Sequence, residues 1–320
     1  MRRIVAAGSI LVDHINEIEA YPNAGELAQI RSVARAPGGL VPNTGRDIRS
    51  LAPDVPVAAF GMVGDDDDGR FAVSALAASG IDTSGISVSR ESKTSFTEVM
   101  SVAGGERTFF TFPGASAAWG YGNFPFDLVS PGDIVLLGYF LLLEKIDGGD
   151  GLRILRELKS RGALTAVDLV TENSHRYALV RECLPHVDFL IVNETEASRL
   201  AGSQDPSDLR SVADSLVKLG VRERIVIHHP GGAVSLGKNG AWSERRSFTL
   251  PRGFIQGKTG AGDAFCAGAL TGIYKGLSDG EILELGSLAA VGALSAPGAT
   301  EGMRSVSDLR HLISTLNFKL

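Results

Sequence analysis

The chain has 320 residues, of which 44% are hydrophobic and 21% are charged. This balance is typical of a globular protein with a large buried core, and it excludes a disordered chain. The formal net charge is −6 and the Lys and Arg residues are scattered, which excludes a basic face for nucleic acid and a polybasic membrane anchor. Cys183 and Cys266 lie far apart and form no disulfide or metal-binding pattern. A small-molecule partner and a reducing cytoplasm are expected.

Apolar runs recur along the chain and are continuous rather than alternating. The first, residues 3–12, follows two arginines, but Gly8, Ser9 and Asp13 interrupt or close it, so it predicts a buried strand rather than a signal peptide. Continuous runs are typical of strands buried on both faces of a parallel sheet. The longest, residues 134–143, is about half the roughly 18 residues that a membrane helix needs. This longest stretch belongs to the run 133–143, and the other runs span residues 56–64, 164–170, 188–194 and 224–229.

Helical patterns lie between these runs. In residues 69–80 apolar side chains recur at helical spacing and the segment ends on Gly80, and residues 151–162 and 206–220 repeat this pattern. The alternation predicts an α/β fold with a doubly wound sheet and helices on both of its faces. We expect residues 1–320 to form one such domain. Ligands would bind beyond the carboxyl ends of the strands.

Two segments, residues 14–35 and 94–112, break this alternation because polar and apolar residues are mixed in strand-like runs. Gly104 and Gly105 stand where the second segment would turn as a hairpin. The pattern predicts a half-exposed antiparallel sheet that closes over a substrate as a lid and excludes water. A hairpin that covers a sheet edge or forms a dimer interface is the alternative.

The stretch GKTGAGDAF, residues 257–265, contains two conflicting patterns. Its first three residues resemble the end of a phosphate-binding P-loop, but that loop needs a glycine at position 252, where the chain has arginine. Residues 254–256 are also too bulky for backbone N–H groups to converge on phosphate. The P-loop interpretation is therefore rejected.

The second half of the stretch places small residues 260–262 directly before an apolar helical run. Free N–H groups at a helix N-terminus bind anions. Asp263, beside them, could take a proton from a hydroxyl group that attacks a bound phosphate. Alternatively, it only occupies the first turn of the helix, where a negative charge contributes about 0.3–1 kcal/mol.

Four stretches, in the expected order, resemble the ribokinase-like (PfkB) carbohydrate kinase family. GKTGAGDAFCAG is similar to its second signature, D-T-x-G-A-G-D-x-F-x-x-G, and GSILVD (8–13) to its first strand. GGLVPNTG (38–45) with GMVGDDDDG (61–69) resembles its first glycine-rich signature, and NETEA (193–197) its N-x-x-E motif. The resemblance implies a ribokinase-like, mostly parallel sheet flanked by helices, with a small β-sheet lid at about 14–35 and 94–112.

The resemblance implies ATP-dependent phosphorylation of a primary hydroxyl group of a small sugar or sugar derivative. Asp263 would be the general base, and the N–H groups of Gly260, Ala261 and Gly262 would form the anion hole. Arg107 in the lid could neutralise a substrate phosphate, although an arginine at a hairpin is more often solvated. The sugar would be held by Asp13, by Gly38 and Gly39, which could also be only a turn, and by Asn43, which could also be only a helix cap.

The same resemblance implies ATP and Mg²⁺ as cofactors. Asn193 and Glu196 would hold the nucleotide phosphates and Mg²⁺, Glu196 largely through metal-bound water. By itself, N-x-x-E is more often a helix-cap pattern. Further nucleotide contacts are expected from His228 and from Gly232 in HHPGGA (228–233), from Lys258 and from Gly262.

The chain departs from the family at Gly257 and Lys258, which replace the Asp-Thr of the signature. In many relatives that aspartate helps to bind a monovalent cation, so the replacement puts such a site in question. We expect Lys258 to supply a fixed positive charge instead. The acidic run 65–68 is expected to be a solvated loop and helix start rather than a metal cluster.

Two other functions stay open. A nucleoside kinase would need an aromatic stacking partner in the lid, such as Phe96 or Phe110. A non-catalytic sugar-binding relative is the second alternative, although the joint presence of Asp263, Asn193 and Glu196 argues against it. The apolar FFTF stretch (109–112) is consistent with a homodimer through the lid.

Overall fold

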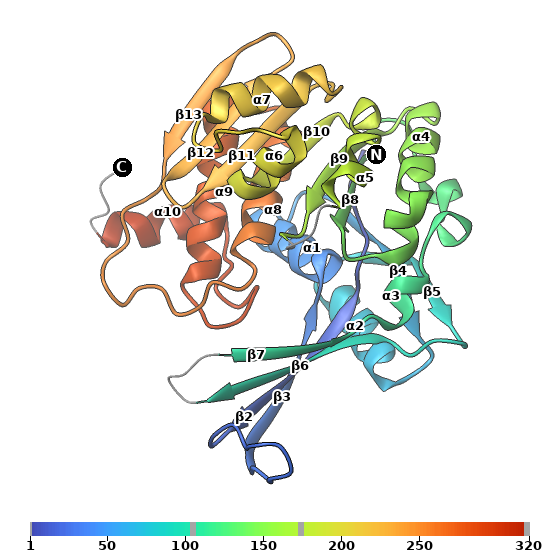
Figure 1. The fold of residues 1–320 in the computed structure, drawn as a ribbon. Coiled ribbons are helices and arrows are strands. Elements are labelled where there is room, and N and C mark those ends of the chain that lie inside the picture. The colour runs from blue at the N-terminus through green and yellow to red at the C-terminus, as the bar shows by residue number, and fades with distance from the viewer. Residues whose placement is uncertain (1, 103–106, 172–175, 317–320) are drawn as a thin grey trace.

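The computed structural model describes residues 2–102, 107–171 and 176–316, arranged as a large sheet flanked by helices and a small sheet that projects from it (Figure 1). The hairpin turn predicted at Gly104 and Gly105 lies outside the described residues. In the described residues the large sheet has nine strands. Their spatial order is β5 (Asp82–Ser89), β4 (Val57–Gly64), β1 (Ile4–Ala7), β8 (Ile134–Phe140), β9 (Leu164–Leu169), β10 (Phe189–Asn193), β11 (Arg224–His229), β12 (Gly232–Gly237) and β13 (Trp242–Arg246).

The large sheet is parallel from β5 to β11, and only the pairs β11–β12 and β12–β13 are antiparallel, so β12 alone runs in the opposite direction. Strands β1, β4, β8, β9 and β10 are buried along almost their whole length, as their continuous apolar runs predicted. The outer strands β5 and β13 are largely exposed or half-buried. Ile134 and Leu136 pack with one layer of helices, whereas Val135 and Leu137 pack with the other. The predicted α/β, doubly wound architecture is therefore confirmed.

Helices cover both faces of the large sheet (Figure 1). The helices predicted at 69–80, 151–162 and 206–220 are present as α2 (Asp67–Ala78), α4 (Gly151–Ser160) and α7 (Leu209–Lys218), with ends shifted by at most three residues. Short 3-10 helices lie at Tyr121–Asn123, Phe126–Leu128 and Leu184–His186, and a π-helical turn at Ile146–Asp150. One layer holds α1 (Leu40–Leu51), α2 (Asp67–Ala78), α8 (Ala261–Lys275), α9 (Asp279–Leu294) and α10 (Val306–Thr315), and the other α3 (Gly114–Ala118), α4 (Gly151–Ser160), α5 (Tyr177–Arg181), α6 (Glu194–Ala201) and α7 (Leu209–Lys218).

The small sheet has the order β3 (Ile30–Gly38), β2 (Leu11–Ile18), β6 (Ser95–Val102) and β7 (Arg107–Phe112). The prediction of an antiparallel sheet is wrong at its centre, because β2 and β6 are parallel. β1 and β5 run in the same direction in the large sheet, and each is followed by a strand of the small sheet. β2 and β6 therefore enter the small sheet in the same sense.

The apolar run 3–12 is not one strand. Gly8 has φ +147°, and a Cβ there would lie 2.8 Å from the carbonyl oxygen of Gly138. The chain turns at this point, so that β1 ends at Ala7 in the large sheet and β2 begins at Leu11 in the small one. Asp13 is thereby carried out of the core onto the small sheet. Within the described residues, every helix falls short of the length and apolar character needed to cross a membrane.

Candidate active site

Asp263 lies in the first turn of α8, where its side chain is buried. Gly260 caps this helix in the left-handed conformation, with φ +77°, and a Cβ at Gly260 would lie 2.7 Å from the carbonyl oxygen of Ala299. The predicted helix start at residues 260–262 is therefore present. Two side chains donate hydrogen bonds to Oδ2 of Asp263, the Asn43 amide and the Tyr139 hydroxyl group, each at 2.9 Å.

Burial raises the pKa of Asp263 to about 6, although the hydrogen bonds from Asn43 and Tyr139 lower it. A carboxyl group with this pKa is largely ionised at neutral pH and still basic enough to accept a proton from a reacting group. The position next to a helix N-terminus adds a favourable field for the charged form. The site thus contains a carboxylate suited to general-base chemistry.

The start of α8 also presents backbone donors. The N–H group of Ala261 donates to the carbonyl oxygen of Lys258 at 3.3 Å. For the N–H groups of Gly260 and Gly262, the described residues provide no acceptor within hydrogen-bond range. Such donors at the end of a 15-residue helix can bind an anion.

Two cavities meet at this helix start. The larger, of about 640 Å³, lies beside α8 and α9 and is lined partly by Gly232, Lys258 and Phe265. The smaller, of about 250 Å³, contains Asp263, Tyr139 and Asp168. Asn193, His228 and Gly262 line both cavities. A ligand in the larger cavity can therefore reach the N-terminus of α8 and the carboxylate of Asp263.

Asn193 and Glu196 stand at the junction between β10 and α6. They form a reciprocal helix cap, since the Glu196 N–H donates to Asn193 Oδ1 at 2.9 Å and the Asn193 N–H donates to Glu196 Oε2 at 3.0 Å. Thr171 connects them, donating to Glu196 Oε1 at 2.6 Å and accepting from Asn193 Nδ2 at 2.7 Å. The capping role considered for this motif is thus present, and Glu196 also faces the smaller cavity.

The described lining of the smaller cavity includes three carboxyl groups, those of Asp168, Glu196 and Asp263, and no Lys or Arg. Burial raises the pKa of Glu196. Burial and the charges of Glu196 and Asp263 raise the pKa of Asp168 well above its usual value. Among the described residues, no three His, Cys, Asp or Glu side chains converge into a ready-made metal site. The lining nevertheless suits a hydrated cation with oxygen ligands, because such a cation would neutralise the crowded carboxylates.

The predicted sugar-binding residues lie around the start of α1 and on β2. Gly39 has φ +88°, and a Cβ there would lie 2.8 Å from the Ser9 carbonyl oxygen. A Cβ at Gly38 would lie 2.5 Å from Oδ2 of Asp13, so the missing side chains leave room for the Asp13 carboxyl group. Burial raises the pKa of Asp13 to about 6. Asn43 is buried and its Oδ1 has no partner among the described residues.

Arg107 is at the start of β7 and exposed. Its Nη1 donates to the carbonyl oxygen of Pro297 at 3.3 Å, so it connects the small sheet to the loop that packs against Gly257 and Gly260. Arg107 is therefore neither free in solvent nor in contact with Asp263. It stands at the rim of the candidate anion site.

The aromatic residues considered for nucleoside stacking lie on the wrong face of the small sheet. In its register, Asp13 pairs with Thr97 and Thr97 with Thr111, so these three share one face. Phe96 and Phe110 belong to the opposite face, and Phe96 stacks on His14 with ring centroids 5.3 Å apart. Phe109, paired with Val99, is on the Asp13 face. The suggestion of Phe96 or Phe110 is therefore wrong, because one residue along a strand reverses the side-chain direction.

His228 and Gly232, both predicted nucleotide contacts, line the larger cavity with Lys258. Burial lowers the pKa of His228 to about 4, so its ring is neutral at physiological pH. The ring packs against Phe265 with centroids 4.7 Å apart. A neutral imidazole in this position can donate or accept one hydrogen bond but brings no charge to a phosphate.

Three acidic or phenolic residues of the site were not found from the sequence. Tyr139 and Asp168 belong to the apolar runs 133–143 and 164–170, where the only signal was a polar group inside a strand expected to be buried. Asp47 lies one helical turn after Asn43, is fully buried, and has no partner for either carboxyl oxygen among the described residues. Burial and the charge of Asp263 raise the pKa of Asp47 well above its usual value.

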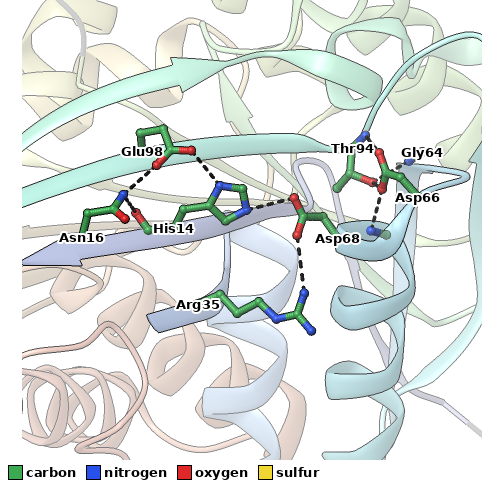
Figure 2. A network of polar contacts seen from close by, with 9 residues as sticks. His14, Asn16, Arg35, Gly64, Asp66, Asp68, Thr94 and Glu98 are labelled. Carbon is green, nitrogen blue, oxygen red and sulfur yellow. Dashed lines mark hydrogen bonds and ion pairs between the residues drawn. The ribbon is translucent and has the colours of Figure 1, made fainter. Parts of the chain in front are cut away.

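The small sheet is attached to the start of α2 by the network in Figure 2. His14 Nδ1 lies 2.9 Å from Glu98 Oε1, and His14 Nε2 lies 2.9 Å from Asp68 Oδ2. Asp66 caps α2 and accepts a hydrogen bond from the Thr94 N–H at 2.8 Å. The acidic run 65–68 does start a helix, but Asp66 and Asp68 are not simply solvated, since both bind segments of the small sheet.

Comparisons with known proteins show the family to which the chain belongs. The family profile described as "pfkB family carbohydrate kinase" matches residues 1–305. Ribokinase of Arabidopsis thaliana is 26% identical, with 99% of this chain and 82% of that protein covered. Adenosine kinase of Schizophyllum commune is 28% identical, with 82% of this chain and 80% of that protein covered.

Solved structures show the same fold. The structure of Arabidopsis thaliana ribokinase complexed with ribose and ATP superposes with a TM-score of 0.80 at 23% identity and covers 98% of this chain and 99% of its own. Ribokinase from Thermotoga maritima gives a TM-score of 0.81 at 19% identity, covering 98% and 100%. The chain belongs to the pfkB family of carbohydrate kinases. It is an ATP-dependent kinase of the group that acts on sugars and nucleosides.

Proposed function

We propose that this kinase transfers the terminal phosphoryl group of ATP to a primary hydroxyl group of a small sugar or sugar derivative, with Asp263 as general base. The observation that carries the proposal is the position of Asp263, buried at the N-terminus of α8 where two cavities meet. Burying a carboxylate costs free energy of folding, so a buried carboxylate beside two cavities indicates a functional role.

In the proposed reaction, the substrate hydroxyl oxygen forms a bond to the terminal phosphorus of ATP as the bond from that phosphorus to the bridging oxygen breaks. The hydroxyl proton passes to Asp263, and ADP leaves. The N–H groups of Gly260, Ala261 and Gly262 would stabilise the transferred group, each donor contributing about 10²–10³ in rate. The Ala261 N–H would exchange its 3.3 Å hydrogen bond to the Lys258 carbonyl oxygen for one to the phosphoryl group. Asp13 and Asn43 would bind the hydroxyl groups of the sugar. Gly38 and Gly39, which lack side chains, would let the sugar approach the backbone.

The larger cavity is the proposed nucleotide site, because its volume of about 640 Å³ is within the usual range for small ligands and its lining is apolar with a few polar groups. Asn193, His228, Gly232 and Lys258 would contact the nucleotide. Glu196, which faces the smaller cavity, would hold Mg²⁺ through water. When bound, Mg²⁺ neutralises charge on the phosphates.

We propose that no monovalent cation assists the site. A side chain at residue 257 would begin 2.7 Å from the carbonyl oxygen of Pro297 and 2.9 Å from that of Ala296, so this backbone leaves no room for the family's aspartate. Lys258, which lines the nucleotide cavity, would supply positive charge there. Arg107 would stay at the rim, close enough to meet a substrate phosphate when the small sheet closes as a lid.

A nucleoside acceptor is the second candidate, and the observation that favours it is Phe109. This aromatic ring is on the Asp13 face of the small sheet and is 54% exposed, so it is available to stack on a base. Phosphorylation of adenosine that is lost in Phe109→Ala would favour this candidate. Phosphorylation of ribose or fructose that is unaffected by Phe109→Ala would favour the free sugar.

The experiment for the main proposal replaces Asp263 by Asn, which keeps size and hydrogen bonding but removes the base. ATP consumption is measured across ketoses, aldoses, sugar acids and nucleosides. We expect Asp263→Asn to lower kcat by about 10²–10⁴-fold while sugar affinity, measured by calorimetry, changes little. Asp67→Asn, in the first turn of α2 and solvent-exposed, is the matched control.

Unchanged turnover in Asp263→Asn would exclude the base role. Sugar binding without ATP consumption by the unmutated protein would instead identify a non-catalytic relative. The two outcomes are distinct because the first concerns the variant and the second the protein itself.

A further inference from the structure

We infer that Tyr139 is a positioning residue that, together with Asn43, fixes Oδ2 of Asp263 and leaves Oδ1 to accept the substrate proton. The inference rests on the proposed role of Asp263 as base. It adds which carboxyl oxygen accepts the proton and which side chains orient the carboxyl group. Both hydrogen bonds found for this carboxyl group among the described residues end on Oδ2. An ionised carboxylate has two acceptor oxygens, so Oδ1 keeps its lone pairs.

The backbone at Tyr139 is held in a costly conformation that aims the side chain into the site. Tyr139 has φ +59° and Leu141 has φ +78°, left-handed values that are unfavourable for residues other than glycine. Such conformations persist only where the surroundings enforce them, and they concentrate at functional sites. Here they occur at the carboxyl end of β8, an interior strand of the large sheet, where the smaller cavity is lined by Tyr139.

The surroundings of this segment do enforce it. The Leu141 N–H donates to Asp147 Oδ1 at 2.7 Å, and the Leu141 carbonyl oxygen accepts from Arg176 Nη2 at 2.6 Å. Asp147 and Arg176 also form an ion pair at 3.5 Å. Both backbone groups of Leu141 are therefore fixed by side chains that bind each other, and the turn that carries Tyr139 is rigid. A rigid donor can orient a base without losing side-chain entropy at each turnover.

Tyr139 remains a donor throughout the physiological pH range. Burial raises the pKa of its hydroxyl group well above the usual value, and the charges of Asp263 and Asp168 raise it further. The phenol therefore keeps its proton and has one strong acceptor available, the Asp263 carboxylate. A donor to a carboxylate stabilises the charged form, which is the form that a base needs.

The need for such a donor follows from the other groups that face Asp263. Asp47 approaches from α1, Asp168 from β9 and Cys266 from α8 itself, and all are neutral or negative. The ring of His228, 3.9 Å from the Cβ position of Gly262, is uncharged. Asp13 and Glu196 add negative charge at the borders of the site. Without the two donors, nothing described on these elements would favour the ionised form except the helix N-terminus.

The test is Tyr139→Phe, which keeps the aromatic ring and removes only the donor. Tyr274→Phe is the matched control, because it removes a hydroxyl group that donates to the Arg2 carbonyl oxygen far from the site. Turnover is measured against pH with ATP and whichever of ribose, fructose and adenosine the protein phosphorylates fastest. In addition, the Asp263 carboxyl group is titrated by NMR in protein labelled with ¹³C at aspartate, with Asp263→Asn identifying the resonance.

In Tyr139→Phe we expect kcat to fall about tenfold or more and KM for the acceptor to stay within about twofold, because the variant loses the contact that orients the base and keeps the groups that bind the acceptor. The acidic limb of kcat/KM and the NMR titration should both move to higher pH. Tyr274→Phe should match the unmutated protein. Should Tyr139→Phe not fold, Tyr139→Gln, which retains a donor, should keep the acidic limb near its original position.

The inference would be overturned if Tyr139→Phe left kcat, the acidic limb of kcat/KM and the NMR titration of Asp263 unchanged. It would also be overturned if the acidic limb moved in folded Tyr139→Gln. This result is distinguishable from failure of the proposed function. If Asp263→Asn is inactive and Tyr139→Phe is normal, only the positioning role is wrong. If Asp263→Asn is active, the base assignment itself is wrong.

Discussion

Gly257 and Lys258 make the clearest difference between this residue pattern and the family signature. Because residue 257 is packed against two carbonyl oxygens and Lys258 lines the nucleotide cavity, we expect turnover to be independent of potassium. Replacing K⁺ by tetramethylammonium at constant ionic strength should change kcat by less than about twofold, within the effect of general salt screening. A several-fold activation by K⁺ would contradict this prediction.

The complementary variant is Lys258→Met, which removes the proposed fixed charge. A charge-assisted contact to phosphate contributes about 1.5–3 kcal/mol, so we expect kcat/KM for ATP to fall about tenfold or more. Arg252→Met, an exposed cation of the same loop, is the matched control and should have little effect. Equal losses in both variants would indicate a general electrostatic effect of the loop rather than a contact by Lys258.

Among the site residues, Asp263 could be proposed as a catalytic residue from the sequence, whereas Tyr139 and Asp168 could not be identified. Asp263 follows three small residues at a helix start, a local pattern with a direct chemical meaning. Tyr139 and Asp168 stand inside apolar runs, and their direction depends on backbone angles at the strand ends, such as φ +59° at Tyr139. The hydrogen bond from Tyr139 to Asp263 joins residues 124 positions apart, and only the folded sheet brings them together.

Among the elements, His14 is one of the side chains that attach the small sheet to α2 (Figure 2). Both ring nitrogens of His14 face carboxyl oxygens at 2.9 Å, and carboxylates only accept, so both nitrogens must donate and the ring must be charged. Burial lowers the pKa of His14, but the hydrogen bonds and charges of Glu98 and Asp68 outweigh it, so the folded pKa is raised.

A raised folded pKa means that the His14 contribution to stability is fully present below about pH 6.5, the unfolded value, and is lost as pH rises through the folded value. We therefore expect the difference in melting temperature between the unmutated protein and His14→Gln to be larger at pH 5.5 than at pH 9. His311→Gln, at an exposed position on α10, should show no such trend. A difference that grows with pH would contradict the charged ring.

The elements were predictable where one physical signal dominates. Strands buried on both faces appear as continuous apolar runs, so β4, β8, β9, β10 and β11 were expected close to their observed places. The strands β5, β12 and β13 were missed because they are polar or glycine-rich. The split between β1 and β2 depends on the left-handed φ of Gly8 and on its close approach to Gly138, neither of which is visible in a run of apolar letters.

For the molecule as a whole, the two faces of the small sheet carry different kinds of side chain. One face carries Asp13, Thr97 and Thr111 and is turned toward the site, since the charge of Asp13 affects Tyr139. The opposite face carries Val33, Phe110 and Phe112, which are 74%, 59% and 41% exposed. We expect the face with Asp13 to close over a substrate, and the apolar side chains exposed on the opposite face then need a partner of their own.

We propose that this partner is a second copy of the chain, because pairing two identical apolar faces about a twofold axis buries both at once. Phe110→Asp places a charge in the middle of this face and should convert a dimer into a monomer, measured by light scattering at micromolar concentrations. Val88→Asp, at an apolar position 60% exposed on β5 of the large sheet, should leave the dimer intact. A monomeric unmutated protein, or a dimer that survives Phe110→Asp, would show that this face has another role.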